Sequence, residues 1–353
     1  MSSFKQLFGT IAVATVMLGS AFAADKDEVT LVFSHPNMAP GEEVFMYAVP
    51  QYMGYFDEEG LDVSIEAASG GAQAAQVMLS GAAEFATTMA EGVLQLREQG
   101  ANPVAFYELK RNNGFAIGVL KDSPIDSLDD LVGKNIGFPV AGGGTKMIVD
   151  ESFRAAGLEP NYNLVVIGAG APAAAAIRNK QVDAAVLWDA AWGIIENLGM
   201  ELDYMELPIQ DKLAGMSLVA RQDHLEENPD LTARFCRAIA KGLHFTLTNK
   251  EAAINIMFEV FPQTLPADLD RETATRQALN VLNKWLHSAQ KGLPYGEKTG
   301  EIRSDRWDFT AQRYNEIGLL ESGASDGAFS TELFEPCNDF DRQAIAAQAK
   351  SAN

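Results

Sequence analysis

Short apolar runs rich in β-branched and aromatic residues alternate with amphipathic stretches from Val29 to Leu207. This alternation is typical of βα units built on a mostly parallel sheet. The pattern therefore predicts an α/β fold for this part of the chain. We expect strands at residues 29–33, 61–66, 84–87, 104–108, 135–138, 165–167, 184–187 and 203–206. Helices are expected at 44–52, 73–80, 92–98, 145–156, 173–179 and 191–197.

The hydrophobic period becomes helical after about Arg221. This tail shows no strand set of its own, so we expect it to pack on the first of two lobes. Phe115–Leu120 and Met216–Ala220 are the expected crossings between the lobes. Lobe one would then comprise residues 24–120 and 215–353, and lobe two residues 121–214. Helices in the tail are expected at 229–248, 268–290 and 304–317.

The chain partly repeats itself at an offset of 99 residues, the offset between Gly71 and Gly170. Residues 71–78 align with 170–177, and residues 81–86 align with 180–185. In each copy a glycine opens an Ala-rich helix, a turn follows, and an acidic residue leads into a short apolar strand. The repeat predicts two similar α/β lobes, an architecture that can close on a small solute.

The first residues have the pattern of an export signal. Lys5 precedes an apolar run from Leu7 to Leu18, and Ala21-Phe22-Ala23 forms a small-x-small cleavage site. The run is too short to span a bilayer as a helix, which disfavours a permanent anchor. We expect residues 1–23 to be removed, without a lipid anchor, because no cysteine lies near the cleavage site.

The net charge argues against a nucleic-acid partner, and the two cysteines leave two interpretations open. The chain has 27 basic and 48 acidic residues, a net charge of −21, so its surface repels nucleic acid. Cys236 and Cys337 could pair in an oxidising compartment. Cys236 also lies in an apolar helical pattern, so a buried unpaired thiol is the other interpretation.

No motif for catalysis, metal binding or cofactor binding is convincing. Residues 168–173 match G-x-G-x-x-A after a strand, but a glycine turn before a helix is the simpler interpretation. The Gly-rich turn at 142–146 lacks P-loop spacing, although its backbone N–H groups could receive a polar or anionic ligand atom. The histidines are dispersed, and G-x-S-x-G is absent. We therefore expect no enzyme, cofactor or metal. His35, at the end of a strand, could face a ligand.

Ligands of open α/β sheets bind beyond the carboxyl ends of the strands. The residues expected there offer hydroxyls, an amide, backbone N–H groups and one large aromatic ring. Trp188 could also be a core residue, but we favour a position facing the ligand. The predicted binding residues are Asn37, Gly70, Gly71, Thr87, Thr88, Gly143, Gly144, Thr145, Trp188 and Asp189.

Several segments together resemble the solute-binding proteins of ABC importers, the group that includes sulfonate, taurine, nitrate and thiamine-pyrimidine-precursor binders. The resemblance covers roughly residues 29–220. Glu84 differs, because the family usually has Asp there. The matching segments are 54–63 (Gly-Tyr-Phe-Asp-Glu-Glu-Gly-Leu-Asp-Val), 79–85 (Leu-Ser-Gly-Ala-Ala-Glu-Phe), 133–137 (Gly-Lys-Asn-Ile-Gly) and 180–189 (Lys-Gln-Val-Asp-Ala-Ala-Val-Leu-Trp-Asp).

The resemblance implies a type II periplasmic-binding-protein fold, with two βα lobes joined by two crossover segments and here a helical C-terminal tail. It also implies a monomer in the periplasm that delivers a small molecule to an inner-membrane permease and its ATPase. The family's eukaryotic pyrimidine-synthase branch is enzymatic, but its Cys-rich signature is absent here. A sensor that presents its ligand to a membrane kinase remains an alternative.

The nature of the ligand is the least determined part of this prediction. A planar nitrogen heterocycle or aromatic solute would suit Trp188, with Phe45, Tyr47 or Met89 nearby. A sulfonate-like anion would instead use backbone N–H groups and hydroxyls, and only Arg111 and Lys146 are plausible basic contacts. We favour the planar solute because the predicted loops lack other basic residues.

Overall fold

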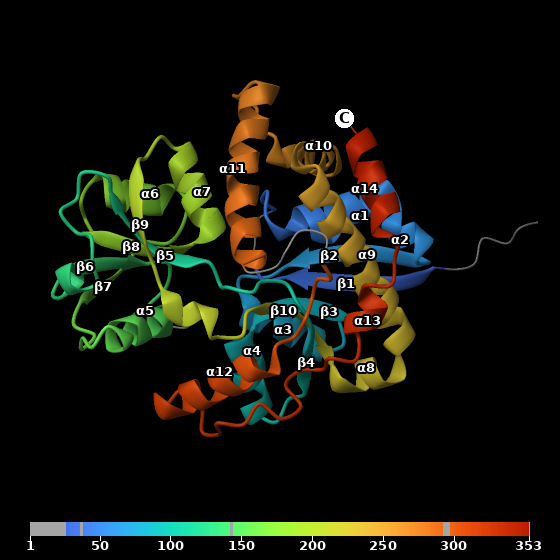
Figure 1. Cartoon of the computed structure of the whole chain (residues 1–353), viewed down its shortest axis with the longest axis horizontal. Helices are drawn as coiled ribbons and strands as arrows, with labels where there is room; N and C mark the ends of the chain where they lie inside the picture. The colour runs from blue at the N-terminus through green and yellow to red at the C-terminus, as the bar shows by residue number, and fades with distance from the viewer. Residues whose placement is uncertain (1–25, 36–37, 142–143, 292–296, 353) are drawn as a thin grey trace, which may run out of the picture.

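The computed structural model describes residues 26–35, 38–141, 144–291 and 297–352. The predicted signal peptide lies outside these residues. Two five-stranded sheets, each with helices packed around it, lie side by side and are joined near the centre of the molecule (Figure 1). We call each sheet with its helices a lobe, and the α/β fold predicted from the sequence is confirmed.

Lobe one is built on the sheet with strand order β2-β1-β3-β10-β4. Strand β1 runs parallel to β2 and β3, whereas β10 runs antiparallel to both of its neighbours. Its strands are β1 (Asp27–Phe33), β2 (Leu61–Ala67), β3 (Phe85–Met89), β4 (Pro103–Glu108) and β10 (Met216–Arg221).

Lobe two repeats this arrangement in the order β7-β6-β8-β5-β9, with β5 antiparallel to β8 and β9. Each sheet thus receives one antiparallel strand next to a linker between the lobes. The strands are β5 (Phe115–Leu120), β6 (Asn135–Phe138), β7 (Asn163–Val166), β8 (Ala184–Trp188) and β9 (Leu202–Glu206).

The sequence repeat is a structural repeat. Strands β3 and β8 have bounds that differ by 99 residues, as have the helices that follow them, α4 (Ala90–Glu98) and α7 (Asp189–Asn197). Helices α3 (Gly71–Leu79) and α6 (Ala171–Arg178) are the matching Ala-rich helices. The alignment from sequence therefore placed equivalent elements of the two lobes correctly.

The other helices pack around this repeat. In the first part of the chain they are a π-helix (Val44–Ala48), α1 (Val49–Met53), α2 (Tyr55–Glu58) and α5 (Gly144–Ala155). The tail contains α8 (Gln222–Glu227), α9 (Pro229–Thr248), α10 (Lys250–Val260), α11 (Arg271–Ala289), α12 (Ser304–Glu316), α13 (Phe334–Cys337) and α14 (Arg342–Ser351). Short 3₁₀ turns occupy Asp129–Leu131, Pro208–Asp211 and Pro262–Thr264.

The assignment of Phe115–Leu120 to lobe one is corrected by the structure. This segment is β5, which pairs with β8 and β9 in the second sheet. Its apolar sequence would suit either sheet, and packing decides. A Cβ atom at Gly118 would lie 2.6 Å from the ring of Trp192, so the absent side chain lets that ring lie on β5. The linkers between the lobes are consequently residues 109–114 and 207–215.

The two linkers are tied to each other at both ends. Toward lobe one, the N–H groups of Leu109 and Lys110 donate to the carbonyl oxygen of Met216, at 2.7 and 3.2 Å. Toward lobe two, the side-chain amide of Gln210 bonds to both the N–H and the C=O of Phe115, at 2.9 and 2.7 Å. A Cβ at Gly215 would lie 1.7 Å from the carbonyl oxygen of Lys110, so only glycine fits there.

The core of lobe one explains the segment 54–63 on which the family resemblance partly rests. Phe56 is buried and stacks on Phe235 of α9, which in turn stacks on Phe85 of β3 with ring centroids 4.3 Å apart. Glu59 accepts hydrogen bonds from Arg237 and Lys241 of α9, each at 2.8 Å. The segment therefore serves to hold α9 against the sheet.

The tail contacts both lobes, whereas the sequence predicted packing on lobe one alone. Helices α9 and α14 cover lobe one, but α11 stands between the lobes and packs closely on α7 (Figure 1). Helix α12 packs on α4 of lobe one, and its Arg313 forms an ion pair with Glu151 of α5 in lobe two. Sequence periodicity defines the buried face of each helix but not the surface that it meets.

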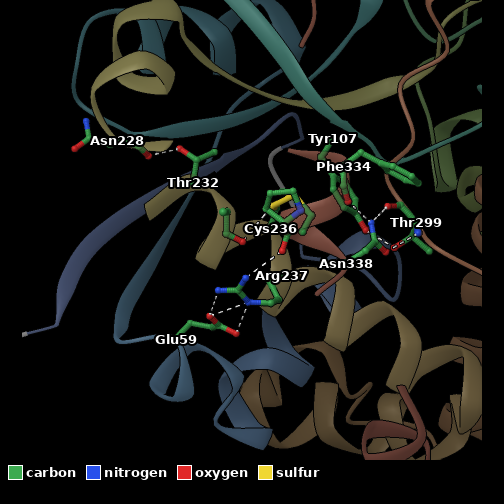
Figure 2. Close-up of a disulfide and its surroundings, with 12 residues drawn as sticks. Glu59, Tyr107, Asn228, Thr232, Cys236, Arg237, Thr299, Phe334 and Asn338 are labelled. Atoms are coloured by element: carbon green, nitrogen blue, oxygen red, sulfur yellow. Dashed lines mark hydrogen bonds and ion pairs between the residues drawn. A yellow bond between two sulfur atoms is a disulfide. The ribbon is translucent and has the colours of Figure 1, made fainter. Parts of the chain in front are cut away.

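A disulfide joins Cys236 of α9 to Cys337 of α13, a pairing that the sequence left open (Figure 2). Both cysteines are fully buried. The neighbouring Arg237 donates to the carbonyl oxygen of Pro336 at 3.1 Å and to Glu59. The C-terminal segment is thus fixed to α9 by a covalent bond and by hydrogen bonds around it.

The disulfide should contribute strongly to stability. It closes a loop with a sequence separation of 101 residues, for which the chain-entropy model gives about 4 to 5 kcal/mol. We expect the Cys236→Ala/Cys337→Ala double variant to unfold at a clearly lower urea concentration than the oxidised parent. Parent protein treated with a thiol reductant should match the double variant. Equal urea midpoints for all three proteins, together with titratable thiols in the untreated parent, would contradict the pairing.

Candidate functional site

The carboxyl ends of the strands in the two lobes meet at one junction. Gly144, the first residue of α5, lies so close to α4 that a Cβ there would be 2.4 Å from Glu91 Oε1. Trp188, at the end of β8, packs against the core of lobe one as well as against that of lobe two. Lys110 of the first linker pairs with Asp189 of α7. We call the strand ends and helix starts around these contacts the inter-lobe site.

On the side of lobe one, most of the predicted residues hold the backbone in place. Thr87 is fully buried, and its hydroxyl accepts a hydrogen bond from the N–H of Ser34 at 2.9 Å. Thr88 is buried beside Gly71, where a Cβ would lie 2.6 Å from its hydroxyl oxygen. Gly70 is half-buried just before α3. Gly71 thus allows the start of α3 to approach the end of β3.

On the side of lobe two, Gly144 and Thr145 form the start of α5, and Thr145 is buried. Asn37 and Gly143, both predicted to bind ligand, lie outside the described residues. The two basic residues that an anion could have used have acidic partners instead. Lys146 pairs with Asp150 at 2.5 Å, and Arg111 pairs with Glu301 at 3.0 Å.

The two tryptophans near the end of β8 have different environments. Trp188 is half-buried at the junction, next to Phe115 in the sheet. Trp192, about one helical turn further on, is 1 % exposed, and its indole N–H donates to the carbonyl oxygen of Ala116 at 3.2 Å. Met89 is the lobe-one counterpart of Trp188 and is also half-buried. Trp188 and Met89 therefore present apolar surface where the lobes meet.

The other aromatic residues considered from sequence pack within lobe one. Phe45 is fully buried, with its ring 4.9 Å from that of Trp285. Tyr47 packs on Phe56 and Phe261, with ring centroids 6.1 and 5.6 Å away. Both belong to the core that supports the inter-lobe site.

His35 forms a cluster with two carboxyl groups that the sequence analysis missed. Its Nε2 atom lies 3.0 Å from Glu42, and its Nδ1 atom lies 3.5 Å from Glu43. In the sequence this acidic pair has the pattern of solvated residues at a helix start, but both side chains are buried. Their burial could have been predicted from their position between His35, at the end of a strand, and the apolar segment that begins at Val44.

The pKa values of the two carboxyl groups in this cluster are shifted in opposite directions. Burial raises the pKa of Glu43 to about 7. Burial would also raise the pKa of Glu42, but His35, Lys110 and Trp285 outweigh burial and lower it. The ligand atoms of the three residues lie within 4.8 Å of one another, as a metal site would require. Since the two ring nitrogens face different carboxyl groups, the arrangement suits a shared proton better than a metal ion.

Asp189 is engaged within the protein. Both of its carboxylate oxygens accept hydrogen bonds from Lys110 Nζ, at 2.9 and 2.8 Å, and one also accepts from the N–H of Ala190. Its role as a ligand contact therefore stays a prediction, and the described geometry gives it a role in joining the lobes.

A cavity of about 470 Å³ lies next to the inter-lobe site, between α11 and lobe two. Of the predicted binding residues that the structure describes, Asp189 lines this cavity. Several of its polar groups already have partners within the protein, such as Lys284 with Glu196 and Gln210 with Phe115. Other lining residues are Asn112, Trp192, Tyr204, His287 and Ser288.

Two α/β lobes joined by two linkers, each with one antiparallel strand, define a periplasmic-binding-protein fold. The crystal structure of the periplasmic aliphatic sulphonate-binding protein SsuA from Escherichia coli is similar, with a TM-score of 0.66 and 17% sequence identity. The similarity covers 84% of this chain and 90% of SsuA. Residues 43–253 match the model of the NMT1/THI5 like family, and the chain belongs to that family.

Curated relatives extend over most of the chain. The riboflavin-binding protein RibY of Chloroflexus aurantiacus is 25% identical over 315 residues, which are 88% of this chain and 86% of RibY. The formylaminopyrimidine-binding protein of Halalkalibacterium halodurans is 26% identical, over 73% of this chain and 79% of its own. A 4-amino-5-hydroxymethyl-2-methylpyrimidine phosphate synthase of Legionella pneumophila is 24% identical, over 69% and 77%.

Among the described residues, no helix is both long enough and apolar enough to cross a membrane.

Glu108, at the end of β4, is buried beside the second linker and should make the stability of the protein depend on pH. It accepts a hydrogen bond from the N–H of Gly215 at 3.1 Å, and has a second carboxyl oxygen without a partner among the described residues. Burial raises the pKa of Glu108 from 4.5 to about 7. The folded protein therefore holds this proton more tightly than the unfolded chain, and the stability from this group falls as pH rises from about 4.5 to 7.

The variant Glu108→Gln keeps the acceptor for Gly215 and removes the titration. We expect its free energy of unfolding to fall less steeply between pH 5 and pH 7.5 than that of the parent. Urea denaturation across this range measures the difference, with Glu28→Gln, an exposed carboxyl on β1, as control. The same slope for Glu108→Gln and Glu28→Gln would instead mean that Glu108 is ionised across this pH range.

Proposed function

We propose that this protein is the solute-binding component of an ABC importer, exported to the periplasm after removal of residues 1–23. It captures a small organic solute between its lobes and delivers it to an inner-membrane permease with its ATPase. The observation that carries the proposal is the inter-lobe site, where equivalent strand ends of two similar lobes meet beside Trp188. Membership of the NMT1/THI5 like family supports the same function.

A planar nitrogen heterocycle or aromatic compound is the ligand class that this site suits best. Trp188 and Met89 offer half-buried apolar surface, and His35 with Glu42 and Glu43 offers hydrogen-bonding groups nearby. The acidic partners of Arg111 and Lys146 leave these side chains less suited to a doubly charged anion. The curated names of two relatives refer to riboflavin and to formylaminopyrimidine, both planar heterocycles.

Two alternatives concern the ligand and the role of the protein. A sulfonate-type anion could bind to the backbone N–H groups at the start of α5, although the likeness to SsuA at 17% identity concerns the fold alone. A sensor for a membrane kinase would share the binding site but not the transporter. An adjacent permease gene and ATPase gene would favour the importer over the sensor.

Binding without turnover is the direct test. Native mass spectrometry of protein purified from the periplasm should show one small molecule per chain. Calorimetry with riboflavin, formylaminopyrimidine and taurine should then give about one site for a planar compound, with thermal stabilisation that grows with its free concentration. Conversion of a bound compound above its uncatalysed rate would instead favour an enzyme, the class named for the Legionella relative. Saturable binding of taurine alone would favour the anion.

Trp188 should supply much of the binding free energy. Truncation of a buried aromatic anchor typically costs 2 kcal/mol or more, so we expect Trp188→Ala to weaken the tightest ligand of this panel about thirtyfold. The matched control is Trp192→Ala, which removes a core side chain and should lower stability by about 3 to 5 kcal/mol with little change in affinity. Calorimetric titration of both variants with this ligand measures their affinities, after circular dichroism has confirmed that they are folded. Parental affinity in Trp188→Ala would mean that the ligand binds elsewhere.

A further inference from the structure

Lys110 contacts lobe one through its backbone and lobe two through its side chain. Its backbone N–H donates to Met216 of β10 in lobe one, at 3.2 Å. Its Nζ atom donates to both carboxylate oxygens of Asp189, the first residue of α7 in lobe two. Because Lys110 stands in the linker, a rotation of lobe two about residues 111–114 and 207–215 would lengthen the contact between Nζ and Asp189.

The pair is shielded from water and supported from lobe one. Both side chains are 6 % exposed. Lys110 Nζ lies 4.6 Å from the ring of Trp285 on α11, and the indole N–H of Trp285 donates to Glu42 at 2.5 Å. Removal of one partner from a buried ion pair leaves the other charge buried without compensation, which is strongly unfavourable. The arrangement of the lobes and the integrity of this pair are therefore coupled.

The segment that the pair fixes belongs to the inter-lobe site. Asp189 follows Trp188 directly, and one of its oxygens accepts a hydrogen bond from the N–H of Ala190 at 2.7 Å. A fixed Asp189 carboxylate thus fixes the end of β8 and the first turn of α7. The position of the Trp188 ring relative to lobe one depends on this turn.

We propose that Lys110 is a positioning residue that holds lobe two, and with it Trp188, against lobe one before any ligand binds. Asp189, as the partner of Lys110, then affects ligand binding indirectly, because it fixes the turn that carries Trp188. The consequence for ligand binding rests on the proposed function, but the interaction itself does not. It can therefore be tested without a ligand.

The protein offers a closely matched control in Lys241. This lysine is also buried, bridges Glu58 and Glu59 at 3.0 and 2.8 Å, and lies 5.8 Å from the ring of Tyr55. All of these partners belong to lobe one. Lys110→Met and Lys241→Met thus each remove a buried ammonium group from beside carboxylates and an aromatic ring, but only the first variant loses a contact between the lobes.

The experiment uses the full mature chain with no added small molecule, after unfolding and refolding to remove any compound that co-purified. Small-angle scattering should give a larger radius of gyration for Lys110→Met than for the parent, and a parental value for Lys241→Met. Amide hydrogen exchange in residues 188–193 should be about tenfold faster in Lys110→Met, as expected for more frequent local opening. Lys110→Arg, which keeps the charge, should restore most of the protection.

Two results would overturn the proposal. One is a parental radius and parental exchange in Lys110→Met. The other is the same change in Lys241→Met, since a general loss of stability would then explain both. If Lys110→Met does not fold, Asp189→Asn replaces it, because this variant keeps the shape of the side chain and removes its charge. Failure of the ligand panel would contradict the proposed function and leave these measurements unaffected.

Discussion

The close contact between the two linkers determines how the two lobes are arranged. At Gly215 the second linker passes so near to the carbonyl oxygen of Lys110 that no side chain fits. Backbone hydrogen bonds to Met216 on one side, and the amide of Gln210 on the other, hold the linkers together. The two linkers consequently lie side by side between the lobes, and their position defines where the strand ends meet.

The composition of the junction follows from that geometry. Surfaces that approach each other between lobes lose water, so buried carboxyl groups there need partners or protons. Asp189 has Lys110, Glu42 has His35 and Trp285, and the pKa values of Glu43 and Glu108 are raised to about 7 by burial. Apolar surface from Trp188 and Met89 lies beside these groups. Such a combination can hold a flat polar molecule by burial of its faces and by hydrogen bonds at its edge.

Much of the fold could be predicted from the sequence because short apolar runs, typical of strands, alternate with amphipathic stretches, typical of helices. The 99-residue repeat shows the same order of helix, turn and strand twice. The bounds of β3, α4, β8 and α7 predicted from the hydrophobic pattern lie within a few residues of the observed ones. The repeat also separated Trp188 from Trp192, since its register puts Trp188 at a strand end. The strand β5 was wrongly assigned to lobe one, because an apolar run does not state which sheet it joins. The fit of Gly118 to Trp192 decides that question in three dimensions.

Contacts between residues far apart in the chain were beyond sequence reasoning. The disulfide links cysteines 101 positions apart, and α11 meets lobe two although it is a neighbour of lobe one in sequence. The burial of Glu42 was missed because its partner Trp285 lies more than 200 residues away in the chain. Ligand contacts at Asn37 and Gly143 remain predictions, as those residues lie outside the described part of the chain.

We place the ligand between the lobes, and the decisive measurement is a crystal structure of the complex with the compound that co-purifies from the periplasm. We predict electron density for one molecule in contact with Trp188 of lobe two and with Met89 or His35 of lobe one. Density confined to the cavity between α11 and lobe two, without contact to Trp188, Met89 or His35, would show that the ligand binds elsewhere.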